Sequence, residues 1–456
     1  MTFAYTPEQF RHLVQFALDQ SLRMGATGAA ADVSESVGLS VSVRCGEVET
    51  IENTRDKSFG VTVYKGQRRG HAASSDFSES AIAQTVKAAL DIASFTAEDA
   101  MAGLPDADTL YAGEHDLKLY HPWKLSADQA VEMALKAERA ALKFDPHIRN
   151  SDGAGVSTEA GHFMAGNSLG FVGGYPYSRH SFSVSPIAQL RKGDASTMQR
   201  DYWYSTARRS RDLADPKAVG EYAARRALAR LNARSVPTQQ CPVMFEAPLA
   251  AGILGSFVQA VSGGALYRKS SFLLDSLGKQ VFADHIDVHE DPFIVRGMGS
   301  SPFDEEGVRT QVRDVVSGGV LQGYFLSTYS ARKLGMKTTG NAGGSHNLRL
   351  TSRHTKKSDD LAAMLRKMGR GLLVTELMGQ GVNYVTGDYS RGAFGYWVEN
   401  GEIAYPVEEI TIAGNVKDML RNIVAVGADE LQRGTKVTGS LIIEGMTVAS
   451  GAGSDE

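Results

Sequence analysis

The sequence is poor in cysteine and has no uninterrupted hydrophobic run long enough to span a membrane. Its two cysteines, Cys45 and Cys241, could form one disulfide at most, and both lie in strand-like apolar contexts. We expect free, buried thiols in such contexts. The longest uncharged stretch, residues 247–267, is broken by Pro248, four glycines and two serines, so we expect no transmembrane helix and no membrane partner.

The opening residues, MTFAYTPEQF, lack the features of a secretion signal. They contain neither a basic segment nor an apolar segment of the kind that precedes a cleavage site. We therefore expect a cytoplasmic protein.

The chain also lacks a basic surplus. It has 48 basic and 52 acidic residues and a net charge of -4. Non-specific binding to phosphate backbones needs an excess of positive charge, and no G-x-x-x-x-G-K-[ST] loop is present to cradle nucleotide phosphates. Direct nucleic-acid binding and nucleotide chemistry are therefore not expected.

The length and the hydrophobic content of the chain are sufficient for packed cores. With 456 residues, of which 42% are hydrophobic, the chain is long enough for roughly two or three domains. We expect an N-terminal α+β region at residues 1–234, with a helix-and-sheet part to about residue 149. Thr6 and Pro7 begin its first helix, the spacing at 78–95 and 126–144 predicts two more, and alternation from Leu39 predicts a small antiparallel sheet.

The segment 150–208 is rich in glycine, serine and aromatic residues, which predicts several short strands with tight turns. Asp215 and Pro216 then cap a helix that we place at 215–234. One face of this helix is basic, and we interpret it as a solvated surface. Its residues are Arg225, Arg226, Arg230 and Arg234.

The remainder, 235–456, is predicted to be a C-terminal domain rich in antiparallel strands, barrel-like or a sandwich, so the fold class is α+β. Residues 313–327 predict a hairpin with a Ser-Gly-Gly turn, and residues 394–414 predict another around Asn400 and Gly401. Helices are expected at 358–368 and 416–426.

The most apolar part of this domain is the stretch 241–275. Cys241, Val243 and Phe245 alternate as in a strand, and Pro248 suits the first turn of a helix. We expect a core helix over 248–262, ended by Gly263 and Gly264. Apolar residues cover the whole surface of this helix except for one narrow strip, or seam, of small and polar residues. The seam consists of Gly252, Gly255, Ser256 and Gln259.

Residues 283–291 gather two histidines and four carboxylates, which are metal-ligand types. Alternation predicts a strand, on which His285 and His289 would lie roughly 13 Å apart. This spacing favours the polar outer face of an edge strand, although a metal site stays open as an alternative.

The C-terminal half contains five distinctive segments, namely SGGALYRKSSFLLDSLG from Ser262, EDPFIVRGMGSSPFDEEGV from Glu290, STYSARKLGMKTTGNAGGSHNL from Ser327, GNVKDMLRNI from Gly414 and GSLIIEGMTVASG from Gly439. In these segments the sequence resembles the TldD/PmbA family, once called modulators of DNA gyrase, and specifically its PmbA (TldE) branch. The N-terminal half resembles the family more loosely, through VRCGEVETIE and SFGVTVYKGQRRGHAASSDFS.

The resemblance implies a dimer enclosing a cavity, in which the TldD partner is a metallopeptidase. The metal site of that partner resembles a helix-borne His-Glu-x-x-x-His motif with a further cysteine ligand near the C-terminus. When the motif is aligned with this chain, Ser256 and Val261 stand at the two histidine positions and Phe257 stands at the glutamate position. No cysteine follows Cys241. None of these residues can replace the ligands or the general base, so we expect no metal, no cofactor and no catalytic residue in this chain.

We therefore expect a non-catalytic subunit of a TldD/PmbA-type peptidase, pairing with a TldD-type subunit and acting on unfolded proteins and peptide precursors. Pairing of the chain with itself stays open when that partner is absent. Two alternatives also stay open: a stand-alone metallopeptidase using residues 285–291, and a regulatory protein that binds DNA gyrase. Five residues in family-like stretches are candidates for lining a peptide path, namely Tyr267, Arg268, Lys269, His346 and Asn347.

Overall fold

The computed structural model describes residues 2–192 and 195–450, and the chain forms two compact units. The first unit runs to Leu231 and also includes Pro302–Arg309. The second unit comprises Asn232–Ser301 and the residues from Thr310 onward.

The first unit begins with a capped helix and continues with long strands. The side chain of Thr6 accepts from the backbone of Gln9, and Pro7 occupies the first turn, as predicted. The elements in order are α1 (Pro7–Arg23), β1 (Gly28–Arg44), β2 (Glu47–Lys65), β3 (Arg68–Ser74), α2 (Glu79–Phe95), η1 (Ala107–Thr109), α3 (Ala127–Leu142), β4 (Ile148–Asn167), β5 (Val172–Gly173), β6 (Pro176–Lys192), β7 (Ala195–Arg200), β8 (Trp203–Ala207), η2 (Ser210–Asp212) and α4 (Pro216–Ala229).

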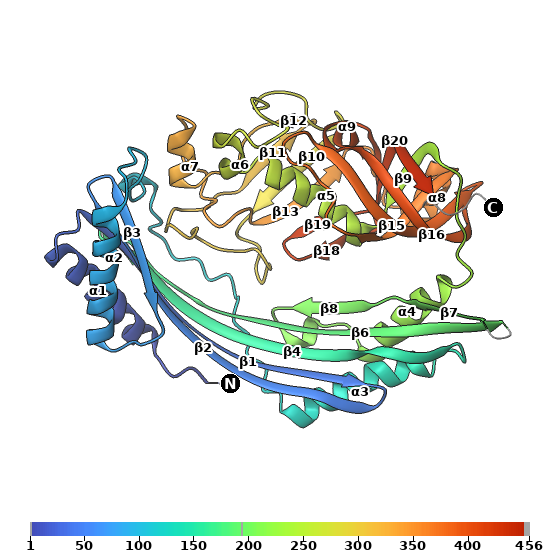
Figure 1. Cartoon of the computed structure of the whole chain (residues 1–456), viewed down its shortest axis with the longest axis horizontal. Coiled ribbons are helices and arrows are strands. Elements are labelled where there is room, and N and C mark those ends of the chain that lie inside the picture. The colour runs from blue at the N-terminus through green and yellow to red at the C-terminus, as the bar shows by residue number, and fades with distance from the viewer. Residues whose placement is uncertain (1, 193–194, 451–456) are drawn as a thin grey trace. The chain divides into compact units, whose positions relative to one another are not determined.

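The strands of this unit form a single eight-stranded antiparallel sheet with the main order β3-β2-β1-β4-β6-β7. Two predictions were wrong here. The sheet is not small, and the strands of 150–208 are not all short, since β4 has 20 residues and β6 has 17 (Figure 1). Glycines and serines in this segment, such as Gly155 and Ser157, lie on one face of the sheet, and alternate with buried Ala154 and Val156 on the other. Their composition suggested turns, whereas the alternation belongs to continuous strands.

Helices α1, α2, α3 and α4 pack on the same face of the sheet. Helices α1 and α2 bury one end of β1 around Val33, and α3 and α4 bury the other end around Val41. The opposite face of β1 carries small polar residues. They are Ser34, Ser36, Ser40 and Ser42.

The helix predicted at 215–234 ends earlier, since α4 stops at Ala229 with Arg230 as its C-cap, and its basic face is not simply a solvated surface. Arg226 Nε lies 3.3 Å and Arg230 Nη1 lies 3.6 Å from Oδ2 of Asp201, which is only 6% exposed. The Arg226 guanidinium also lies 5.1 Å from the ring centre of Trp203. The interpretation was wrong because Asp201 lies far from α4 in the sequence, and nothing local to the helix indicates its counter-ion.

We expect Asp201→Ala to destabilise the first unit strongly, because it leaves two arginines around a buried position without their shared carboxylate. Removing one partner of a buried ion pair costs about 3–5 kcal/mol. The control is Asp91→Ala, which removes an exposed i,i+4 pair with Lys87 and costs less than about 1 kcal/mol. Urea unfolding followed by circular dichroism measures both, and equal midpoints for the two variants would contradict the prediction.

The second unit is rich in strands and contains several short helices. Its elements in order are β9 (Gln239–Phe245), α5 (Ala247–Ala260), α6 (Gly263–Tyr267), β10 (Ile286–Asp291), β11 (Arg313–Ser317), β12 (Val320–Leu321), α7 (Thr328–Lys333), β13 (Asn347–Ser352), α8 (Leu361–Met368), β14 (Gly371–Met378), β15 (Asp388–Glu399), β16 (Glu402–Asn415), α9 (Val416–Arg421), β17 (Ile423–Val426), β18 (Leu431–Arg433), β19 (Lys436–Thr438) and β20 (Leu441–Ser450).

The predicted α+β class and the barrel-like C-terminal region are confirmed. Strands β16-β15-β14-β9-β20 close into a small barrel through pairing of β16 with β20, and a second sheet has the order β12-β11-β10-β13-β19-β18. Both predicted hairpins form, with positive φ at Gly318 and Gly319 in one turn and at Asn400 and Gly401 in the other. The predicted helix at 416–426 ends at Arg421, and the strand β17 takes up its last residues.

Within the described residues, no helix is both long enough and apolar enough to cross a membrane. This agrees with the interruptions found in the 247–267 stretch.

Candidate functional site

Helix α5 lies at the centre of the second unit, as its composition predicted. Leu254 and Phe257 are fully buried in a core that includes Phe245 and Val374 of the barrel and Val288 of the second sheet. The helix begins at Ala247 with Pro248 in its first turn and ends at Ala260, slightly earlier than predicted. Gly263 and Gly264 do not simply end it, because they begin the short helix α6.

The three positions of the implied metal motif have no ligand to offer. Phe257 packs edge-on against Phe282 with ring centres 4.9 Å apart, and Val261 is fully buried. The Ser256 hydroxyl donates a hydrogen bond to Gly252 O at 3.3 Å, closing on its own helix. Among residues 2–192 and 195–450, no three histidine, cysteine, aspartate or glutamate side chains group as metal ligands would. The residues present therefore do not fit a metal ion at this helix.

The seam of α5 is open on one side. A Cβ on Gly252 would have no neighbour within 4 Å, and a Cβ on Gly255 would meet only Cε of Lys436, at 3.8 Å. Burial lowers the pKa of the Lys436 ammonium from its ordinary value. Lys436 is a candidate functional residue that sequence reasoning missed. Its position in the short strand β19 gave no signal, because only the fold brings β19 next to α5.

The predicted peptide-path residues Tyr267, Arg268 and Lys269 lie at the end of α6. The Arg268 guanidinium covers the Tyr267 ring at 5.2 Å and donates to its hydroxyl at 3.1 Å. Tyr267 in turn meets Tyr329 of α7 edge to face, with ring centres 5.7 Å apart. Lys269 is exposed with a positive φ of 55°. These residues make an accessible aromatic and cationic surface.

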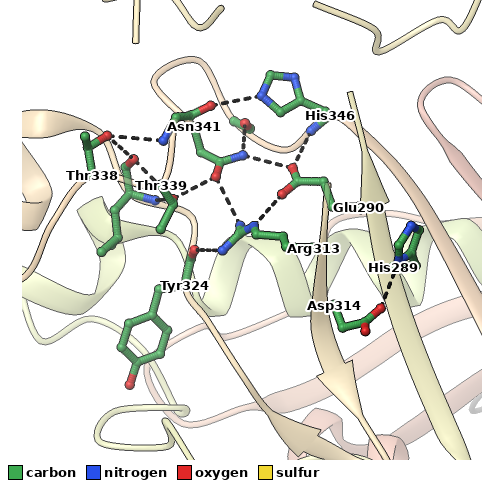
Figure 2. A network of polar contacts seen from close by, with 12 residues as sticks. His289, Glu290, Arg313, Asp314, Tyr324, Thr338, Thr339, Asn341 and His346 are labelled. Atoms are coloured by element: carbon green, nitrogen blue, oxygen red, sulfur yellow. Dashed lines mark hydrogen bonds and ion pairs between the residues drawn. The ribbon is translucent and has the colours of Figure 1, made fainter. Parts of the chain in front are cut away.

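His346 belongs to a buried polar network around Glu290, which is 1% exposed (Figure 2). Oε1 of Glu290 accepts from His346 N at 2.8 Å and from Asn341 Nδ2 at 2.9 Å. Oε2 accepts from Arg313 Nε at 2.7 Å. Arg313 also donates to Tyr324 O at 2.8 Å and to Asn341 Oδ1 at 3.0 Å. The network ties β10, β11 and the loop before β13 together.

Asn347 is also buried and has fixed partners. Its Oδ1 accepts from Gly299 N at 2.7 Å, and its Nδ2 donates to Asp291 O and Ser300 Oγ, each at 2.8 Å. His346 Nε2 lies 2.9 Å from Gly340 O. His346, in the loop before β13, and Asn347, the first residue of β13, are thus buried and held by fixed partners, whereas the residues at the end of α6 are accessible. The five candidates do not converge on one surface.

We expect Glu290→Gln to destabilise the second unit by about 3–5 kcal/mol, because Arg313 would lose its buried counter-ion. The matched control is Asp314→Asn on the neighbouring strand, since Asp314 pairs at the surface with His289 at 2.8 Å and should cost less than about 1 kcal/mol. Urea midpoints measure both. If the two variants unfold at the same urea concentration, the network does not hold these loops.

The histidines of the 283–291 stretch are separated, as their spacing predicted. His285 is buried, with Nδ1 2.7 Å from Ser352 Oγ and Nε2 2.9 Å from Ile423 O. His289 is exposed beside Asp314 (Figure 2). Two parts of the interpretation were wrong, because His285 and Glu290 are buried rather than on an outer face, and β10 is not an edge strand. It lies between β11 and β13, partners that are distant in the sequence.

The two thiols differ in environment. Cys241 in β9 is partly buried, and burial raises its pKa to about 11. Cys45 is exposed in the turn after β1, with a positive φ of 50°, so the expectation that both thiols are buried was wrong. Its Sγ donates to Asn150 Oδ1 at 3.2 Å.

We expect iodoacetamide at pH 8 to alkylate Cys45 much faster than Cys241, because the thiolate is the nucleophile and the pKa of Cys241 is about 11. Raising the pH to 9 should leave Cys241 mostly protonated. Mass spectrometry of the peptides measures both rates, and urea should equalise them. Comparable rates in the folded protein would contradict the burial of Cys241.

Comparison with known proteins assigns the family. Residues 29–93, 120–231 and 238–450 match the models described as domain 1, the central domain and the C-terminal domain of the PmbA/TldA metallopeptidases. The chain is 48% identical to metalloprotease PmbA of Escherichia coli O157:H7 over 445 residues, which is 97% of each chain. The chain belongs to the PmbA/TldD metallopeptidase family.

Solved structures of similar proteins share the fold over nearly the whole chain. A candidate modulator of DNA gyrase from Bacteroides thetaiotaomicron is 27% identical, with a TM-score of 0.90 and coverage of 98% of this chain and 99% of that one. TldE from Thermococcus kodakarensis is 20% identical, with a TM-score of 0.82 and coverage of 97% and 100%, which shows a common fold alone. The family resemblance found in the sequence is thus confirmed.

Proposed function

We propose that this chain is the metal-free subunit of a PmbA/TldD-type metallopeptidase and acts with a TldD-type subunit on unfolded proteins and peptide precursors in the cytoplasm. The observation that carries the proposal is the content of α5. Where the catalytic relatives are expected to carry a helix-borne metal motif, this helix has Ser256, Phe257 and Val261, two of which are hydrophobic core residues.

These side chains support a scaffold role on chemical grounds. A phenyl ring and an isopropyl group cannot bind Zn²⁺, and the Ser256 hydroxyl is used within its own helix. The hydrolytic metal would therefore be held by the TldD-type subunit. This chain would supply binding surface for the substrate, including backbone edges that an extended peptide can join as an added strand. Without that partner the chain could pair with itself.

Co-expression with a TldD-type subunit tests the proposal. A permanently unfolded substrate, such as reduced and carboxymethylated lactalbumin, should be cleaved in a chelator-sensitive way by the complex and by neither chain alone. Size-exclusion chromatography should show a stable complex of the two chains. Chelator-sensitive cleavage by this chain alone, after removal of the partner, would refute the proposal.

A variant of Ser256 on α5 distinguishes a structural role of this helix from a catalytic role. Ser256→Ala removes the one polar side chain among the three motif positions and should leave cleavage by the complex within about twofold, since its hydroxyl is hydrogen-bonded within its own helix and the loss of such a bond lowers folding stability, by about 1 kcal/mol or less, rather than catalysis. Loss of activity with an unchanged melting temperature would mean that Ser256 takes part in the chemistry.

A second candidate is a stand-alone metallopeptidase, favoured by the name of the Escherichia coli O157:H7 relative, metalloprotease PmbA. Its site would have to include the exposed His289 and Asp314. Tight stoichiometric zinc in the purified chain, lost in His289→Ala, would support it. A regulatory contact with DNA gyrase is the third possibility, suggested by the solved Bacteroides relative, and it predicts binding to gyrase without the TldD-type subunit.

A further inference from the structure

Strand β2 has an unpaired edge. On one side it pairs with β1 along its whole length, from Gly28 opposite Tyr64 to Arg44 opposite Glu47. On the other side β3 pairs only from Phe59 onward. Across the described parts of the chain, no strand or bridge pairs with residues 47–58 on that second side, and all of these residues are exposed.

Half of the backbone groups in this stretch have no ladder partner. Along an edge strand every second residue directs its N–H and C=O away from the sheet. Most proteins block such edges with proline, a covering segment or a distorted strand. Here the register shift beside Ser42 and Val43 disturbs only the beginning of the strand, so pairing is regular from Thr50 to Lys57. No proline occurs in this segment.

A groove runs along the middle of this edge, within the first unit. Its volume is about 430 Å³. It is lined by Val37 and Leu39 of β1, by Leu125 just before α3, and by Ala127, the first residue of that helix. The lining residues contributed by β2 are Asn53, Thr54 and Arg55. A side chain projecting from a strand added to this edge would meet both apolar and polar lining residues there.

The two faces of the edge carry different charges. Ile51, Asn53 and Arg55 lie opposite Val41, Leu39 and Val37, which face the helices. Glu52 and Asp56 lie opposite Ser40 and Ser36, on the uncovered face of the sheet. Lys57 lies opposite Glu35 on the groove face, which therefore carries Ile51 together with two cations, whereas the other face is acidic.

We propose that the edge of β2 from Thr50 to Lys57 is a binding site for an extended polypeptide, which joins the sheet as an added strand. The ligand class is a segment in which basic and apolar side chains alternate. Its basic side chains would lie beside Glu52 and Asp56, and an apolar side chain would enter the groove over Leu39. The identity of the ligand as substrate rests on the proposed function, while the edge and the groove are features of the chain itself.

The charge pattern favours such a peptide over a second copy of this chain. When two identical edges pair about a two-fold axis, the same faces of the two strands come together. The acidic face with Glu47, Glu52 and Asp56 would then meet its own copy, and like charges on neighbouring strands are destabilising. A foreign segment carrying lysine or arginine at alternate positions has no such conflict.

Two neighbouring proline variants of the full-length chain test the edge, because adjacent residues point their N–H groups to opposite sides. Of Asn53→Pro and Thr54→Pro, one removes a ladder donor to β1 and should lower the melting temperature, whereas the other removes an outward donor and should melt like the parent. The probe is a short fluorescent peptide of alternating lysine and valine, with binding followed by anisotropy. The variant with the parental melting temperature should bind this peptide at least about fivefold more weakly, the equivalent of roughly one hydrogen bond. Parental affinity in that variant overturns the proposal.

A charge reversal provides a test that does not depend on proline. Glu52→Lys combined with Asp56→Lys changes only exposed side chains and should invert the preference, so that a glutamate and valine peptide binds more tightly than the lysine and valine peptide. An unchanged preference overturns the proposal. A concentration-dependent dimer of the parent that the outward proline variant loses, with no peptide binding in either, would assign the edge to a second copy and also overturn it.

These measurements use the chain by itself, so they are independent of the co-expression experiment. Loss of cleavage by the complex with intact peptide binding would count against the proposed function and leave the edge site standing. Cleavage by the complex without peptide binding to the edge would count against the edge site and leave the proposed function standing.

Discussion

The burial of α5 is the constraint on which the second unit depends. This helix packs against both a closed five-stranded barrel and a six-stranded sheet, and Leu254 and Phe257 belong to a core that includes residues of both. A helix covered on most sides must be apolar on most sides. Polar groups can then lie beside the helix only along the narrow seam at Gly252 and Gly255, where the small residues leave open space next to Lys436.

Polar groups that are buried elsewhere serve to join segments distant in the sequence. Asp201 holds one arginine of α4 and one at the C-cap of that helix, and Glu290 accepts from donors of β11 and of the loop before β13. Such networks are stable only when each buried group is satisfied. This explains why His346, a residue type associated with catalysis, has a structural environment here, and why candidates chosen by residue type divided into buried and accessible groups.

The first unit presents the opposite arrangement. Its helices cover one face of a long sheet and leave the other face lined by small hydroxyl side chains, with the edge of β2 beside it. Backbone groups at an open edge recognise polypeptide with little regard to sequence, and the flanking charges then add selectivity. A binding surface in this unit would complement a second unit whose central helix is committed to packing.

The sequence by itself determined the local structure. Several features depend on residues close together in the chain, whose propensities act at short range. They are the capping at Thr6 and Ser126, the turn at Asn400-Gly401, the apolar helix that begins at Pro248 and the sequence segments typical of the family. Only the tertiary structure decided the rest. The long strands of 150–208, the interior position of β10, the partners of Arg226 and Arg230, the contact of Lys436 with α5 and the free edge of β2 depend on which distant segments meet. The side chains of one segment do not encode the identity of a partner that is distant in the sequence, and so these features could not be predicted from local pattern.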